Sequence, residues 1–208
     1  MSTVKSKNLQ VGTDATASNN FTIYQPSTPD GTLRIGVGNA DSPTEVARVN
    51  SDGLADANGQ KLSNTPIVVA KKTSSQVPSN ATWTKIELNT TDIDTDSAFD
   101  TSTNYRFTVP TGKAGKYLIN ASVLANAITT SNLRRSLCAV RKNGSEMRPR
   151  HDQNCDLNYL ASTTNNITLI LDLAEGDYLE LWGYITWASG SGQFETGGTC
   201  LSLHKIIG

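Results

Sequence analysis

The amino-acid sequence predicts an all-β protein built as a two-sheet β-sandwich or jelly roll. Apolar residues alternate with polar ones over several segments, turn-forming residues separate those segments, and no segment shows a convincing helical period. The 208-residue chain is also rich in Thr, Ser and Asn, which suit turns and exposed sheet faces and disfavour helix interiors. Several strands at this spacing favour a sandwich or a jelly roll.

The clearest alternation lies after residue 65. The segment 117–123 carries apolar side chains at every second position, and the segment 167–173 repeats the pattern with Thr168 and Asp172 turned the other way. A period of two marks a strand with one face on a core. Turn signals separate these segments, and Asn143-Gly144 suits a tight hairpin. We therefore expect residues 66–208 to form a jelly-roll knob domain.

Residues 1–65 have a different texture. Short apolar alternations such as Phe21-Thr22-Ile23 are broken every few residues by turn formers such as Pro29-Asp30-Gly31. The segment holds too few large apolar side chains for a core of its own. We expect an extended, β-rich amino-terminal segment for attachment or trimerisation, which becomes ordered on other chains or on a docking surface.

Charge and hydropathy argue against several classes of function. The formal net charge of -1 favours neither a nucleic acid nor a membrane surface as partner. No apolar run approaches the ~20 residues of a membrane-spanning helix. Met1 is not followed by the apolar stretch of a secretory signal. We expect a soluble product that is made in a cytoplasm and does not insert into a membrane.

The segment 177–187 predicts self-association. One face of this expected strand is aliphatic, while the other carries Tyr178, Trp182 and Tyr184 around Glu180. A sandwich strand in a monomer usually shows water its second face, and Tyr and Trp are enriched at protein interfaces. We expect these three rings to lie in a subunit interface. The alternative is that a loop of the same chain covers them.

Four motifs, in chain order, resemble the trimeric jelly-roll heads of the tumour-necrosis-factor and complement-q superfamily. They are the turn and strand Phe99–Pro110, the strand start Gly115–Ile119, the hairpin Val140–Gly144 and the segment Leu173–Leu181. The final segment Cys200–Ile206 lacks the aromatic residues and the glycine usual there. The resemblance covers residues 66–208. It implies a compact homotrimer with no catalytic residues, and no calcium-site carboxylates can be carried over.

The first 65 residues lack a collagen-like stalk and resemble the Thr-, Asn- and Gly-rich segments of bacteriophage fibre and virion-decoration proteins. Together the two resemblances imply a phage virion structural protein, a trimeric capsid decoration or a head or tail fibre. It would bind other virion proteins, in the capsid or the tail, through residues 1–65 and display the knob on the virion surface. The alternative is a carbohydrate- or receptor-binding adhesin module of a tail fibre, made in the host cytoplasm.

A basic stretch supplies candidate ligand contacts. Its members, opposed only by Glu146, are Arg134, Arg135, Arg141, Lys142, Arg148 and Arg150. They could meet an anionic polymer such as host surface polysaccharide, or form a solvated hairpin whose charges pair with Asp and Glu elsewhere. With the loops 148–156 and 188–198, the candidate contacts are Trp83, Arg148, Arg150 and His151.

Residue spacing favours no catalytic or metal site. Cys155 lies four residues from His151, but both fall in the polar segment 148–156, which we expect to be a solvated loop rather than a catalytic dyad. No known zinc-ligand spacing is present. The acidic run 92–96 is turn-rich and offers no paired carboxylates for hydrolysis. We therefore expect no enzyme activity, no cofactor and no metal, and we expect the three cysteines to be buried thiols.

Overall fold

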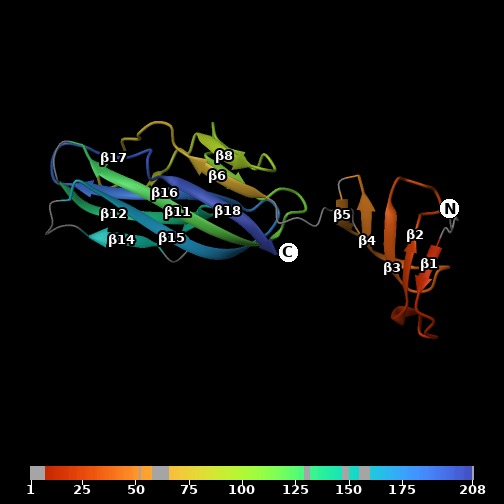
Figure 1. Ribbon diagram of the computed structural model, residues 1–208. Coiled ribbons are helices and arrows are strands. Elements are labelled where there is room, and N and C mark those ends of the chain that lie inside the picture. The colour runs from red at the N-terminus through yellow and green to blue at the C-terminus, as the bar shows by residue number, and fades with distance from the viewer. Residues whose placement is uncertain are drawn as a thin grey trace. The chain divides into compact units, whose positions relative to one another are not determined.

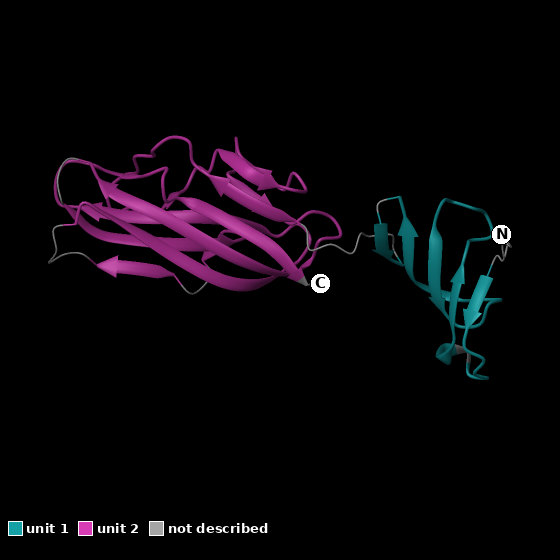
Figure 2. Cartoon of the chain, in the orientation of Figure 1, with its two compact units in different colours: residues 1–63 teal, residues 64–208 magenta. Residues whose placement is uncertain are grey.

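The structure is a computed structural model that describes residues 8–51, 53–57, 66–128, 132–146, 150–154 and 160–207. The chain divides into two compact units, residues 1–63 and 64–208 (Figure 2). Within the described residues, strands dominate and the helical structure is limited to one 3-10 turn at Ala17–Asn19 (Figure 1). The all-β prediction is confirmed. The described part also contains no helix of the length and hydropathy needed to cross a membrane.

The first unit is a five-stranded antiparallel sheet in which each strand pairs with the next one along the chain. We call it the N-terminal sheet, and its strands are β1 (Asn8–Val11), β2 (Phe21–Tyr24), β3 (Leu33–Val37), β4 (Thr44–Asn50) and β5 (Gly53–Asp56). Gly12 and Gly38 follow β1 and β3 with φ of 105° and 117°. Only glycine enters this region without strain, so these residues let the chain turn at once. A side chain on Gly12 would also meet Asn20 Oδ1 at 2.6 Å.

The second unit is a sandwich of two antiparallel sheets. The first, called the β16 sheet, has the order β13 (Ser145–Glu146), β12 (Leu133–Lys142), β16 (Tyr178–Trp187), β10 (Arg106–Thr108) and β9 (Phe99–Asp100), with β14 (His151–Asn154) beside β12 and β7 (Thr84–Lys85) beside β16. The second, called the β18 sheet, has the order β15 (Ser162–Leu173), β11 (Gly115–Ala127), β18 (Cys200–Ile207), β6 (Ile67–Lys71) and β8 (Thr90–Asp94), with β17 (Gly192–Phe194) beside β11.

The chain alternates between the two sheets of the second unit. It passes from β10 to β11, returns to β12, and later runs from β15 to β16 and on to β18. This alternation gives a jelly roll, in which each sheet contains strands that are distant in sequence. Figure 1 shows the long strands β11, β12, β15, β16 and β18 lying along one another in the layers of the sandwich. The predicted fold class, a jelly-roll sandwich, is the one observed.

A closed hydrophobic core lies between these two sheets. Phe107, Tyr117, Leu181 and Phe194 have no exposed surface, and the rings of Phe107 and Tyr117 lie 5.7 Å apart. The predicted alternation of residues 117–123 is confirmed, because the apolar side chains at alternate positions are all buried there. Burial raises the pKa of the Tyr117 phenol, whose hydroxyl donates to the backbone carbonyl of Lys113. The second unit thus supplies its own core.

Local expectations were met in one place and wrong in two. Asn143 and Gly144 have φ of 51° and 81°, as a two-residue turn with both central residues at positive φ requires, and they join β12 to β13. The segment 148–156 is not only loop, because residues 151–154 form β14 and pair with β12. The acidic run is not only turn either, because residues 90–94 form β8.

Candidate functional site

The outer face of the β16 sheet gathers the aromatic residues that were singled out in the sequence. Leu179, Leu181 and Ile185 of β16 are buried in the core, so the alternate residues face outward. We call this surface the aromatic–arginine face, and it comprises Trp83, Arg106, Arg141, Tyr178, Trp182 and Tyr184. The predicted division of β16 into an aliphatic and an aromatic face is confirmed.

Arginines from neighbouring strands cover the rings of this face. Arg141 Cζ lies 3.8 Å from the centre of the Trp182 ring and 5.7 Å from that of Trp83. Arg106 Cζ lies 4.2 Å from the centre of the Tyr178 ring. A guanidinium over an aromatic face is attracted by the ring quadrupole, more strongly where water is excluded. Side chains of the same chain therefore cover part of the surface that was predicted to be a subunit interface.

Carboxylates balance these arginines in a row that crosses the sheet. Arg141 pairs in register with Glu146 of β13 on one side and with Glu180 of β16 on the other. On β10, Arg106 pairs with Asp100 of β9. The next residue, Phe107, pairs with Leu179 of β16, so Arg106 lies beside Glu180. Signs therefore alternate across five strands, the arrangement in which cross-strand pairs stabilise a sheet.

Glu180 is the buried centre of the row. It is only 7% exposed, and Lys85 Nζ and Trp182 Nε1 donate to its two carboxylate oxygens at 3.1 and 3.0 Å. Lys85 also donates to the carbonyl of Asn104 at 3.0 Å. A buried carboxylate with both oxygens occupied is a structural anchor. The indole of Trp182 is thereby held in one orientation.

A shallow pocket of about 200 Å³ opens beside this row. It is lined by Trp83, Arg135, Leu137, Arg150 and Tyr184. The rings of Trp83 and Tyr184 lie 5.6 Å apart and are tilted by 49°, which is a favourable geometry for an aromatic pair. Two of the predicted ligand contacts, Trp83 and Arg150, thus line one pocket together with a residue predicted for the interface, Tyr184.

The basic stretch is largely paired within the chain. Arg135 donates from Nε and Nη2 to the two carboxylate oxygens of Asp152 at 2.9 and 2.5 Å, which holds the pKa of that carboxyl below its usual range. Arg150 lies 3.6 Å from Glu146. These pairs fit the hypothesis of a hairpin with internal ion pairs better than that of a free cationic patch. Arg148 lies outside the described residues.

His151 and the cysteines have structural contacts. His151 lies on β14 opposite Cys138, and its Nδ1 accepts a hydrogen bond from the backbone amide of Asn166 at 3.0 Å. Cys138 is buried, and burial raises the pKa of its thiol to about 12. Cys200 is partly buried, with a pKa also raised by burial. Cys155 lies outside the described residues. Within the described part, no three His, Cys, Asp or Glu side chains are placed to hold a metal ion.

The outer face of the β18 sheet is more apolar than the aromatic–arginine face. Leu118 of β11 pairs in register with Ile170 on one side and with His204 on the other, and His204 pairs with Ile67. Ile170 is 60% exposed. We call this the isoleucine face, and it comprises Ile67, Ile93, Leu118, Ile170 and Ile206.

Charges on the isoleucine face stand at its margins. Lys116 pairs with Asp172 at 2.9 Å, and Lys71 with Asp92 at 2.5 Å. The row next to Leu118 carries the neutral residues Thr168, Asn120, Ser202, Val69 and Ile93. Sequence reasoning missed this face, because single isoleucines on four strands come together only through the register of the sheet.

The N-terminal sheet has one polar and one apolar face. On the polar face, Asn20 is fully buried, and its side-chain amide donates to the carbonyl of Asp14 at 2.8 Å and to Asn39 Oδ1 at 3.0 Å. Arg34 Nη1 donates to Glu45 at 2.9 Å on the same face. The polar side of the sheet is therefore closed by its own side chains.

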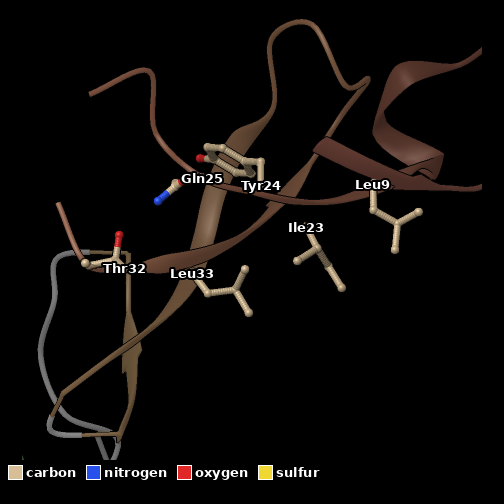
Figure 3. A pocket seen from close by; sticks show the side chains of 7 residues that line it. Leu9, Ile23, Tyr24, Gln25, Thr32 and Leu33 are labelled. Atoms are coloured by element: carbon tan, nitrogen blue, oxygen red, sulfur yellow. The ribbon is translucent and has the colours of Figure 1, made fainter. Parts of the chain in front are cut away.

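The apolar side of the N-terminal sheet is left uncovered by the described part of residues 1–63. Figure 3 shows Leu9, Ile23 and Leu33 projecting from the same side of three strands, with Tyr24 on the opposite side. They border a shallow pocket of about 440 Å³. We call this side the open face. Its apolar residues, which are paired across neighbouring strands, are Leu9, Val11, Phe21, Ile23, Leu33, Ile35, Val37, Val49 and Leu54.

The fold defines the class of the second unit as a jelly-roll sandwich, and solved structures of that class resemble the chain. No family model and no curated protein matches the sequence. The chain is similar to murine APRIL (14% identity, 67% of this chain and 98% of that chain, TM-score 0.46), to the globular domain of zebrafish complement 1qA (12%, 69% and 97%, TM-score 0.47) and to the Eiger TNF of S. frugiperda (13%, 69% and 94%, TM-score 0.47). The phage-type resemblance of the first 65 residues stays a prediction.

Proposed function

We propose that this chain is a non-enzymatic structural protein of a phage particle, a homotrimer that displays a jelly-roll knob on the virion surface. The carrying observation is the contrast between its two units. The second unit closes a hydrophobic core of its own, whereas the described residues of the first leave an apolar sheet face uncovered, which favours a protein partner. The first unit, with its exposed apolar face, suits permanent association with other protein chains, which supports a role in assembly for residues 1–65.

For the trimer contact in the knob, the isoleucine face is the better candidate of the two outer faces. Its isoleucines and Leu118 lie among uncharged residues and its charged pairs lie at the margin, as expected of an interface with a polar rim. On the other sheet, Trp182 and Tyr178 already lie under arginines of the same chain. We therefore assign subunit contact to the isoleucine face and leave the aromatic–arginine face exposed to the surroundings of the particle.

Two substitutions in the full-length chain separate these assignments. Ile170→Asp places a charge at the most exposed apolar position of the isoleucine face and should shift the knob contact toward dissociation at micromolar concentration, read by sedimentation velocity. Trp182→Ala should leave the oligomer intact. If Trp182→Ala dissociates the oligomer and Ile170→Asp does not, the three aromatic rings of β16 form the subunit interface instead. Immunogold labelling of purified particles tests the location, and a particle fraction without label refutes a virion protein.

A second candidate function, carbohydrate or receptor binding, is favoured by the pocket beside Trp83. A partly exposed indole paired with a tyrosine offers a stacking surface, and Arg150 in the pocket lining offers donors for an anionic sugar. A glycan array probed with the wild-type chain and with Trp83→Ala discriminates the two functions. Binding that Trp83→Ala abolishes supports a receptor-binding module. An array with no signal leaves display on the virion surface as the function of the chain. The paired variant Arg148→Ala with Arg150→Ala tests the basic contribution.

A further inference from the structure

The N-terminal sheet presents its apolar residues on the side that none of the described residues of its unit covers. Seven of them are between 36% and 58% exposed, namely Leu9, Val11, Phe21, Ile23, Leu33, Val49 and Leu54. Such sheets normally turn their apolar face to a core and their polar face to water. Here the buried side chains include Asn20, Thr22 and Ala55, which lie on the other side or at its margin.

Register shows that the open face is continuous. Val11, Phe21 and Val37 form one cross-strand row. A second row runs through Leu9, Ile23, Ile35 and Ala47, and a third through Leu33, Val49 and Leu54. These rows carry no charge until the second reaches Asp56 on the last strand. A partner must therefore also be uncharged and aliphatic where it touches this surface.

The area of the open face approaches that of a stable interface. Seven large apolar residues exposed to this extent present roughly 600 Å², at the upper end of what a monomer leaves uncovered. A specific protein–protein contact takes about 800 Å² from each partner. The half-buried side chains of Ile35 and Val37 extend the same surface. One sheet face of this size can bury itself against another at the roughly 10 Å spacing of packed sheets.

We propose that the open face is covered by the same face of the other copies of this chain, so that the N-terminal sheets of one oligomer share a single apolar core. This deepens the proposed function and rests on its homotrimer. Each copy supplies the matching uncharged surface, and linkage to a trimeric knob holds the faces at a high effective concentration. The polar side, with Arg34 and Glu45, is then the surface that remains for binding the particle.

The experiment uses photo-cross-linking in the full-length protein. Phe21, at 51% exposure, is replaced by p-benzoylphenylalanine, and unlabelled chains are mixed with nitrogen-15-labelled chains before assembly. The expected result is a cross-link between a light and a heavy chain that mass spectrometry maps to residues 8–57 of both. The matched control carries the same amino acid at Tyr24, which projects from the opposite side (Figure 3), and should give no such product.

The outcomes separate this inference from the proposed function. A trimer in sedimentation whose Phe21 probe cross-links to no other chain, or only to residues 64–208, overturns the shared core and leaves the trimeric knob standing. A chain that sediments as a monomer overturns the trimer together with the shared core. Inter-chain cross-links within residues 8–57 of the purified protein, found together with particles that carry no immunogold label, would support the core and refute the virion location.

Discussion

Gly183 is the residue at which the smallest change should disturb the knob most. It lies within β16, opposite Cys138 of β12 and Thr84 of β7. A Cβ atom there would lie 2.7 Å from Cε1 and Cζ of Phe194 and 3.0 Å from Cδ1 of Ile86. Both neighbours are fully buried in the core, so the rigid ring of Phe194 has no free space into which to move.

The expected cost follows from this geometry. Forcing an extra methyl group into a well-packed core typically costs about 1–3 kcal/mol. In a protein of this size each kcal/mol lowers the melting temperature by about 2–4 °C, so Gly183→Ala should melt roughly 2–12 °C below the wild-type chain. Scanning calorimetry of the full-length protein measures the transition, and urea unfolding gives the free-energy difference directly.

Gly197→Ala is the matched control. A Cβ atom at Gly197 meets nothing within 4 Å, and its φ lies outside the left-handed region. Surface changes of this kind usually stay within about 0.5 kcal/mol, so this variant should melt with the wild-type chain. If Gly183→Ala also melted with the wild-type chain, the close packing of β17 against β16 would be wrong.

Three further predictions concern single groups. Lys142 and Asn143 lower the pKa of Asp177 from 3.8 to about 2. The ionised Asp177 carboxylate therefore stabilises the fold above pH 3.8, and this contribution is lost as the pH falls through about 2. Asp177→Asn should unfold at lower urea concentration than wild type at neutral pH, and the difference should shrink between pH 3.8 and pH 2. The Cys138 thiol, with its pKa raised to about 12 by burial, should react with a thiol reagent only after unfolding, and labelling of the native chain would contradict its burial. Asn20→Ala should remove a fully buried side chain and leave the backbone amide of Asp14, in the turn after β1, without its acceptor. It should cost about 1–3 kcal/mol and speed hydrogen exchange in residues 12–16, whereas unchanged exchange would refute the anchoring role.

The fold could be predicted from the sequence where the pattern of residues lies within a single strand or turn. Alternation at period two lies within a single strand, so the buried and outward sides of β11, β15 and β16 followed from residue order alone. The turn at Asn143-Gly144 was equally local. In contrast, β14 carries no apolar alternation, because it is a short polar strand that pairs with β12 mainly through its backbone. Its assignment as loop was therefore wrong.

The candidate site was less readable, because its contacts join distant strands. Tyr178, Trp182 and Tyr184 were found as outward rings, but their coverage by Arg106 and Arg141 depends on how β10, β12 and β16 align. No pattern within a strand encodes that register. The open face of the N-terminal sheet shows the same limit. Its apolar residues could be counted in the sequence, while their collection on one side required the pairing of five strands.

The position of β18 has a consequence for how the chain is made. This last strand lies between β11 and β6, and Leu203 pairs with residues that are far earlier in the chain. The N-terminal sheet pairs only neighbours and can fold while synthesis continues, whereas the sandwich waits for residues 200–207 to leave the ribosome. Until then β6 and β11 expose unpaired edges that other nascent chains can join. Premature termination before β18 should therefore yield aggregates rather than a smaller knob.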